Sequence, residues 1–396
     1  PTLVVGCDAR YGSSEFATAA CRVASAAGVR VLALPQANPT PLTSFSMLHF
    51  DADAGVMVTA SHNPAPDNGY KVYLGGTVAQ GDGRGVQIVP PFDAEIAAAI
   101  EAAPPADEVP MNDDLIEAVD PREEYVACAS ALASGEASAR EDLRIVLTAM
   151  HGVGAAITSR VLAEAGFSNV SLVAAQADPD PDFPTVPFPN PEEAGALDMA
   201  IEQAREQGAD LIIAVDPDAD RCALAVPDPA SETGWSPLSG DQIGSLLGEF
   251  LASRGMKGSL ANSIVSSRLL SRIARAHGLE HHTTLTGFKW IARAPGLGFG
   301  YEEAIGFCPD PAHVRDKDGI ATSVVAASLV AALKAQGRGV WDELERLARL
   351  HGLHVSSPLT FRVEQIEQIA SGMARLRAQP PSVLAGSPVV EVSDLS

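Results

Sequence analysis

Residues 211–221 read L-I-I-A-V-D-P-D-A-D-R, in which five apolar residues run directly into a loop with a carboxylate at every second position. A short apolar run that ends in a turn is typical of a buried strand in a parallel sheet. Two other polar loops follow apolar runs in the same way: T-A-S-H-N-P at 59–64 follows 54–58, and Y-E-E-A-I-G at 301–306 follows 298–300. One plan, a strand that ends in a polar loop, therefore occurs three times.

Each of the three units alternates predicted strands with predicted helices. In the first unit we expect strands at 3–7, 29–34 and 54–58, and helices at 14–27 and 41–50. In the second we expect strands at 143–147, 170–173 and 211–215, and helices at 155–165 and 191–207. In the third we expect strands at 260–265, 281–285 and 298–300, and helices at 268–277 and from about Gly287. This alternation predicts parallel sheets covered by helices, with sites beyond the carboxyl ends of the strands.

The predicted fold class follows from this repeat. It is α/β: three similar α/β domains with mixed, mostly parallel sheets around a central cleft, plus an incomplete fourth α+β domain. The expected boundaries are 1–142, 143–256, 257–355 and 356–396. In the last segment we expect a helix at 363–376 and a strand at 389–392, which are too few elements to bury a core of their own.

The overall composition limits what the chain can bind. With 396 residues, 46% of them hydrophobic and 19% charged, the chain is expected to be a soluble globular protein of about two to four domains. The net charge of −23 argues against nucleic acid and anionic membrane as partners, because both require basic patches. No apolar run reaches the roughly 18 residues of a membrane span.

The cysteines bear on the cellular compartment. There are five, an odd number, and they form no C-x-x-C pair. This predicts reduced thiols and a cytoplasmic protein. Nothing in the sequence indicates an oligomeric state.

The acidic loop at 216–221, which we call the metal loop, is the first candidate site. Alternate residues of an extended loop project to one side, so Asp216, Asp218 and Asp220 can converge on one hard cation. Mg²⁺ suits such a site because it takes few protein carboxylates, together with water and a phosphate oxygen. Arg221 adds a fixed fork for phosphate oxygens. The alternatives are an acidic turn or a structural calcium loop, although the Gly and distal Glu of the EF-hand pattern are missing.

The loop at 59–64, which we call the serine loop, supplies a candidate nucleophile. Ser61 follows a predicted strand and precedes a polar turn, an arrangement that exposes a hydroxyl. Serine and asparagine also cap helices and turns, so a structural role is the alternative. His62 could polarise a phosphoryl oxygen or satisfy the turn. The Asn68–Lys71 stretch is predicted to be a turn that returns a lysine to the same rim.

The loop at 301–306, which we call the sugar loop, carries two carboxylates. Glu302 and Glu303 can accept hydrogen bonds from sugar hydroxyls. Further along, R-D-K-D-G at 315–319 places Lys317 between two acids. This is either a solvated charge cluster or an ammonium group that moves protons at a reacting hydroxyl.

Only five lysines occur in the chain, and their positions are informative. Lys71, Lys289 and Lys317 are predicted to lie in Gly- or Asp-containing turns. One such lysine is typical of a solvated surface charge, whereas three near the polar loops favour a phosphate-binding site. Arg10 and Arg315 complete the basic residues expected to bind substrate.

Taken together, these motifs resemble the alpha-D-phosphohexomutase family, the phosphoglucomutases and phosphomannomutases. The T-A-S-H-N-P loop, the D-x-D-x-D-R loop and the E-E pair occur in the family's order, and the resemblance covers nearly all 396 residues. T-L-T-G-F-K at 284–289, Y-E-E-A-I-G-F at 301–307 and R-D-K-D-G look closest to the phosphoglucomutase-2-like branch, which includes phosphopentomutases.

The resemblance implies a mechanism. Ser61 would be the phosphoserine, and Ser61 with the three aspartates would hold Mg²⁺. The enzyme would interconvert hexose 1-phosphate and hexose 6-phosphate of glucose, mannose or both, with a sugar 1,6-bisphosphate as intermediate and activator. The implied catalytic residues are Ser61, Lys317, Arg221 and His62. The implied substrate-binding residues are Lys71, Lys289, Glu302, Glu303, Arg315 and Arg10.

Three departures from the family pattern leave alternatives open. Ala304 replaces the serine of the family's sugar loop, so sugar preference among glucose, mannose, N-acetylglucosamine and pentose phosphates is not predicted. The family's Gly/Arg leader before Pro1 and the Ser-Gly-Thr phosphate loop of the fourth domain are not in this sequence, and we expect the natural protein to carry both.

Three other functions compete with the phosphohexomutase interpretation. One is a phosphopentomutase of the same family, and another is a non-catalytic phosphosugar-binding protein. The third is a phosphatase or mutase of the haloacid dehalogenase type, in which the first Asp of D-x-D attacks phosphorus. That type usually has Thr or Ser where this chain has Asp220, and it leaves the serine loop unexplained.

Overall fold

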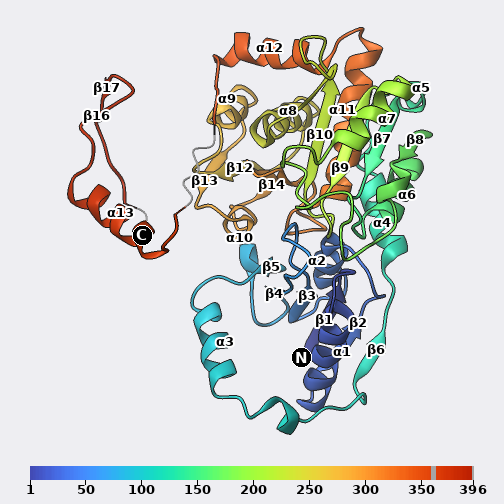
Figure 1. Ribbon diagram of the computed structural model, residues 1–396, viewed down its shortest axis with the longest axis vertical. Coiled ribbons are helices and arrows are strands. Elements are labelled where there is room, and N and C mark those ends of the chain that lie inside the picture. The colour runs from blue at the N-terminus through green and yellow to red at the C-terminus, as the bar shows by residue number, and fades with distance from the viewer. Residues whose placement is uncertain (358–362, 395–396) are drawn as a thin grey trace. The chain divides into compact units, whose positions relative to one another are not determined.

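The computed structural model describes residues 1–357 and 363–394, and the chain divides into two compact units, 1–354 and 355–396. The first unit contains three separate sheets, each formed by one stretch of the chain in succession (Figure 1). The predicted architecture of three α/β domains with mixed, mostly parallel sheets is confirmed. The boundaries between domains stay predictions.

The first sheet has the strand order β5-β4-β3-β1-β2-β6. Its strands are β1 (Thr2–Cys7), β2 (Arg30–Ala33), β3 (Ala54–Val58), β4 (Tyr70–Leu74), β5 (Val86–Gln87) and β6 (Ile116–Ala118). Four of them, β1, β2, β3 and β6, pair in parallel, while β4 pairs antiparallel with both β3 and β5. The helices of this stretch are α1 (Ser13–Ala26), α2 (Thr40–His49), α3 (Phe92–Glu101) and α4 (Arg122–Ser130). The serine loop follows β3, in the middle of the sheet.

The second sheet has the order β11-β10-β9-β7-β8. Its strands are β7 (Arg144–Thr148), β8 (Asn169–Leu172), β9 (Leu211–Val215), β10 (Cys222–Pro227) and β11 (Trp235–Pro237), with helices α5 (Ala137–Asp142), α6 (Ala155–Glu164) and α7 (Asp198–Gln207). All five residues of β9 are buried, as their uninterrupted apolar character predicts. The metal loop connects β9 to the antiparallel β10.

The third sheet has the order β13-β12-β14-β15. Its strands are β12 (Ser259–Ser263), β13 (His281–Thr284), β14 (Leu297–Glu302) and β15 (Gly306–Cys308). Its helices are α8 (Gly240–Ser253), α9 (Leu269–Ala276), α10 (Phe288–Ile291), α11 (Gly319–Ala335) and α12 (Val340–His351). The helix α11, orange in Figure 1, leaves this sheet and packs on α5, α6, β9 and β10 of the second stretch. It therefore joins the second and third stretches through a shared core.

No single helix within residues 1–357 and 363–394 is long and apolar enough to cross a membrane. The helices α11 and α12 meet the length and composition criteria only when they are taken together, with a bend of 91° between them. Nearly every residue of α11 is buried inside the protein.

Several predicted elements differ from the structure for local reasons. The helix predicted at 191–207 begins only at Asp198, because Gly195 has a left-handed backbone conformation, with a φ of 83°, which does not fit a right-handed helix. The helix after Gly287 lasts four residues. Lys71 lies on strand β4, paired with Met57, instead of in the predicted turn.

The second unit contains α13 (Glu367–Ala378), β16 (Val383–Leu384) and β17 (Ser387–Pro388). The strand predicted at 389–392 is wrong. Ala385 and Gly386 both have positive φ, 46° and 79°, as in the two-residue turn of a tight hairpin, so pairing occurs between 383–384 and 387–388. No residue of α13, β16 or β17 is buried.

Candidate active site

The metal loop forms a buried group of carboxylates. Asp216, Asp218 and Asp220 are fully buried, and one oxygen from each lies within 4.8 Å of the others. Two of their oxygens, Asp218 Oδ1 and Asp220 Oδ1, have no hydrogen-bond partner in the described part of the chain. Unpartnered buried carboxylate oxygens are costly unless a cation satisfies them. The donor set of three hard oxygen ligands therefore fits a divalent cation such as Mg²⁺.

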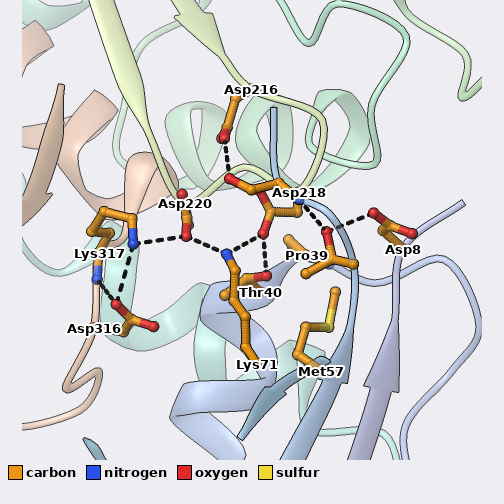
Figure 2. Close-up of polar contacts among 12 residues, drawn as sticks. Asp8, Pro39, Thr40, Met57, Lys71, Asp216, Asp218, Asp220, Asp316 and Lys317 are labelled. Atoms are coloured by element: carbon orange, nitrogen blue, oxygen red, sulfur yellow. Dashed lines mark hydrogen bonds and ion pairs between the residues drawn. The ribbon is translucent and has the colours of Figure 1, made fainter. Parts of the chain in front are cut away.

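Two lysines face these carboxylates, as Figure 2 shows. Lys71 Nζ lies 2.6 Å from Asp218 Oδ2 and 2.5 Å from Asp220 Oδ2, and Lys317 Nζ lies 3.1 Å from Asp220 Oδ2. Burial lowers the pKa of both lysines, but the neighbouring carboxylates raise it by more, so both values end above the ordinary one. Both lysines are therefore cationic at neutral pH and concentrate positive charge at this carboxylate group.

The carboxylates respond unequally to this environment. Burial, followed by repulsion from Asp218 and Asp220, raises the pKa of Asp216 well above its ordinary value. Burial also acts to raise the pKa of Asp220, but Lys317, Lys71 and Arg221 outweigh it, and the pKa is lowered. The anionic form of Asp216 is thus disfavoured, and a divalent cation would stabilise it.

Backbone and helix contacts hold the metal loop in shape. Arg221 N donates to Asp216 Oδ1 (2.9 Å), and Arg221 Nη1 donates to the Ala304 carbonyl of the sugar loop (3.1 Å). Thr40, at the first position of α2, donates its backbone N–H to the Asp218 carbonyl (2.9 Å) and its hydroxyl to Asp218 Oδ2 (2.5 Å). The positive end of the α2 dipole therefore lies at Asp218. Sequence reasoning missed Thr40, for which Pro39-Thr40-Pro41 at a helix start was the available signal.

Close packing under the loop gives a testable consequence for stability. A Cβ on Gly152 would lie 2.3 Å from Pro217 Cα and 2.4 Å from the Pro217 carbonyl oxygen. We expect Gly152→Ala to lower the free energy of unfolding in urea by about 1–3 kcal/mol, the usual range for overpacking. Gly83→Ala is the control, because its nearest neighbour, Arg293 Nε, would be 3.8 Å away. Equal unfolding free energies for the two variants would contradict the expectation.

The serine loop presents its hydroxyl to the metal loop. Ser61 Oγ lies 3.2 Å from Asp216 Oδ2 and 3.3 Å from His62 Nδ1. Ser61 has a φ of +53°, a conformation that residues other than glycine rarely adopt. Burial, then the charge of Arg221, lowers the pKa of His62 to about 4. The ring is therefore neutral at pH 7 and makes a neutral hydrogen bond with Ser61.

The sugar loop contributes Glu302, at the end of β14, and Glu303. Glu302 is buried, which raises its pKa, while Lys317 and Arg221 oppose that rise. Glu303 Oε2 accepts hydrogen bonds from Ser263 Oγ (2.8 Å) and Ser266 Oγ (2.9 Å), which sequence reasoning did not anticipate. Glu302 is therefore the carboxylate next to Lys317 and Arg221, whereas Glu303 accepts hydrogen bonds from two serines.

Two of the predicted cations lie elsewhere. Arg315 Nη2 donates to the Ala292 carbonyl at 2.8 Å and lies 3.9 Å from Asp82 Oδ1. Lys289 is half-buried on α10. Within the described residues, neither side chain forms an ion pair with the three aspartates. Sequence spacing placed them near the site, but the structure brings only Lys71, Lys317 and Arg221 to the carboxylates.

Comparison with known proteins identifies the family. The phosphoglucomutase/phosphomannomutase α/β/α domains I, II and III match residues 1–106, 123–230 and 239–349. A protein of Haemophilus influenzae that carries the name "Probable phosphomannomutase" is 44% identical over 402 residues, which cover all of this chain and 80% of that protein. The chain belongs to the phosphoglucomutase/phosphomannomutase family. It is accordingly a phosphohexomutase, an enzyme of the isomerase class.

Other family members are also similar to this chain in sequence and in fold. A phosphoglucomutase of Staphylococcus haemolyticus is 34% identical over 414 residues, which cover this whole chain and 73% of the relative. The crystal structure of a Thermus thermophilus protein assigned as a phosphomannomutase superposes with a TM-score of 0.73 at 28% identity, covering 89% of this chain and 76% of that one. Family membership extends from sequence to fold, and the phosphohexomutase family binds phosphosugars.

Asp316, one of the two acids that flank Lys317 in the sequence of this phosphohexomutase, makes contacts that the sequence did not predict. Asp316 is buried, and its Oδ2 accepts hydrogen bonds from Tyr73 OH (2.7 Å) and Gln87 Nε2 (2.6 Å) of the first sheet. Its Oδ1 lies 3.5 Å from Lys317 Nζ. Figure 2 shows Lys317 between Asp316 and Asp220. Asp316 therefore connects strands β4 and β5 to the lysine of the third stretch.

Proposed function

We propose that this phosphohexomutase interconverts hexose 1-phosphate and hexose 6-phosphate, of glucose, mannose or both, through a phosphoserine at Ser61. The observation that carries the proposal is the 3.2 Å approach of Ser61 Oγ to Asp216, within a buried carboxylate group that has unpartnered oxygens. The family membership of the chain supports the reaction class. Relatives that carry the names "Probable phosphomannomutase" and "Phosphoglucomutase" support the hexose.

In this proposal Asp216, Asp218, Asp220 and Ser61 hold Mg²⁺. The bound ion would neutralise charge on the transferring phosphoryl group. Arg221 and Lys71 add fixed positive charge at the same place, since the transition state of phosphoryl transfer spreads negative charge over its oxygens. Phosphate esters react extremely slowly without catalysis. Charge stabilisation must therefore provide most of the reduction in the activation barrier.

The chemical step balances in both directions. The phosphorus–Oγ bond of Ser61 breaks while a bond from phosphorus to the free sugar hydroxyl oxygen forms, and the proton lost from that hydroxyl is replaced by one on Ser61 Oγ, which becomes a free hydroxyl again. The resulting sugar 1,6-bisphosphate turns around and returns its other phosphoryl group to Ser61. Lys317 is the proposed proton carrier between the two oxygens: its ammonium form donates a proton to the departing Ser61 Oγ, and the resulting amine accepts the proton of the sugar hydroxyl. Its position between two carboxylates supports this role. Exogenous bisphosphate would prime the unphosphorylated enzyme, so it is the proposed activator.

The remaining roles are assigned more broadly. Glu302 is proposed to contact sugar hydroxyls, because its carboxylate is the one beside Lys317 and Arg221. Lys289 and Arg315 are retained as proposed ligands for the distant part of the substrate. The phosphoglucomutase-2-like branch and a cytoplasmic location also stay proposals. The dehalogenase-type alternative is disfavoured by Ser61, which that chemistry leaves without a role.

The test is a coupled assay with the 1-phosphates of glucose, mannose, N-acetylglucosamine and a pentose, each primed with a trace of the matching sugar bisphosphate. We expect turnover with a hexose phosphate, and an acid-stable phosphoryl group on the peptide that contains Ser61. A preference for the pentose would instead support the phosphopentomutase. An acid-labile phosphoryl group on Asp216 would replace the proposal with the dehalogenase mechanism, and no turnover with any sugar would reject it.

A further inference from the structure

Arg10 was expected to bind substrate, but its guanidinium is buried beneath the serine loop. Nη2 donates to the carbonyls of Ser61 (2.6 Å) and Asn63 (2.8 Å), and Nη1 donates to the carbonyl of Pro64 (3.0 Å). Nη1 also lies 3.4 Å from the Asp67 carbonyl, just beyond the loop. Arg10 as a whole is only 5% exposed. Both terminal nitrogens of the guanidinium thus donate to backbone carbonyl oxygens, which leaves no pair of N–H groups free to bind a phosphate.

A second set of contacts reaches the same loop from the same strand end. Asp8 follows β1 and lies 3.3 Å from Arg10 Nε. Its carboxylate accepts the hydroxyls of Ser13 (2.6 Å) and Thr59 (2.7 Å). Thr59 Oγ1 in turn accepts the backbone N–H of Ser61 at 2.9 Å. Both backbone polar groups of Ser61 are therefore held, the carbonyl by Arg10 and the N–H by Thr59.

This attachment matters because the backbone of Ser61 is in an unfavourable conformation. A non-glycine residue at positive φ costs on the order of 1–3 kcal/mol and persists only where its surroundings over-determine it. The chain passes through such a conformation at Ser61, with a φ of +53°. Without the contacts to Arg10 and Thr59, the loop is expected to relax and to move Oγ away from Asp216.

Arg10 also contacts the stretch that carries the metal loop. Its guanidinium carbon lies 5.0 Å from the ring centre of Phe183, in the connection between β8 and α7. Tyr11, the next residue, donates its hydroxyl to Asp182 Oδ1 at 2.9 Å. The residues that hold the serine loop are thus packed against the part of the chain that leads into β9 and the three aspartates.

We infer that Asp8, Arg10 and Thr59 form a clamp that positions Ser61 for phosphoryl transfer, and that Arg10 does not bind the substrate. This inference rests on the proposed function of Ser61. Positioning residues act on the chemical step, because a displacement of about 1 Å of a reacting group costs roughly a hundredfold in rate. A ligand of the substrate would instead act mainly on KM.

The experiment compares Arg10→Met, Arg10→Lys and Thr59→Val with Arg30→Met. Arg30 is an exposed arginine on β2 that pairs only with Glu117 among the described residues, so it serves as the matched control. Each variant is measured for kcat and KM in the coupled assay, for Mg²⁺ affinity, for thermal stability, and for hydrogen exchange of the amides of Ser61, Asn63 and Asp67.

We expect Arg10→Met to lower kcat by about a hundredfold, with KM within about threefold and Mg²⁺ affinity within about twofold of wild type. Exchange in the serine loop should accelerate by at least about tenfold. Thr59→Val should act in the same direction, Arg10→Lys should recover part of kcat because it keeps one donor group, and Arg30→Met should match wild type.

Three results would overturn the inference. One is a higher KM at unchanged kcat in Arg10→Met, which would indicate that Arg10 binds the substrate. Another is unchanged exchange in the serine loop. The third is a lower Tm with full kcat in the folded fraction, which would show a purely structural role. If wild type itself turned over no phosphosugar, the proposed function would fail, while the exchange measurement would still decide whether the clamp holds the loop.

Discussion

Replacing Ser61 with alanine is expected to lower mutase turnover by at least about a thousandfold while the fold remains intact. The hydroxyl is the proposed acceptor and donor of the phosphoryl group, and removing a nucleophile eliminates the covalent route. Ser61 Oγ contacts only Asp216 and His62 among the described residues, so its loss leaves no buried cluster unsatisfied. The measurements are kcat in the coupled assay and the mass of the intact protein after incubation with sugar bisphosphate.

Two comparisons make this prediction specific. Ser231→Ala changes a serine in the exposed turn before β11 and should keep full activity and full phosphorylation. Mg²⁺ affinity of Ser61→Ala should fall far less than its kcat, since the three aspartates remain. Turnover within tenfold of wild type, or phosphorylation of the variant to the wild-type extent, would show that another residue carries the phosphoryl group.

Asp218→Asn is expected to weaken Mg²⁺ binding by at least about a hundredfold and to lower kcat at moderate Mg²⁺ concentration with it. The substitution removes one of three ligand charges, and a partner outside the ligand set already costs 10–100-fold when it is lost. It also places an amide where, in the wild-type protein, Lys71 and Thr40 donate hydrogen bonds to a carboxylate oxygen. Calorimetric titration with Mg²⁺ and the Mg²⁺ dependence of turnover measure the two effects.

The control for this variant is Asp113→Asn. Asp113 is exposed and pairs with Arg22 at the surface, far in sequence from the metal loop. Removing its charge should leave both Mg²⁺ affinity and kcat unchanged. A common loss in the two variants would indicate an effect of net charge, and an unchanged Mg²⁺ requirement in Asp218→Asn would remove this residue from the proposed ligand set.

Most of the fold was predictable because the repeating pattern has a direct physical cause. The apolar run Leu211–Val215 is buried along its whole length, and burial of both faces is what such a run predicts. The errors lie where local pattern is ambiguous. The helix predicted from 191 extended across Gly195, whose left-handed backbone (φ 83°) precedes the observed start at Asp198. The short hairpin of the second unit depends on a turn at Ala385-Gly386 that hydrophobic pattern does not report.

The sequence by itself determined which residue types end each central strand: a serine after β3, three aspartates after β9 and two glutamates at β14. Strand ends of parallel sheets are where sites form, so these residues were predictable candidates.

Only the tertiary structure decided their partners. It placed Lys71 and Lys317 on the aspartates and Thr40 beneath Asp218, and it turned Arg10 into the serine loop and Glu303 toward two serines. The physical reason is that each of these contacts joins segments distant in sequence, between which local propensity carries no information. Arg10, for example, is a loop arginine in sequence and becomes a buried donor only when β1 and β3 pair side by side.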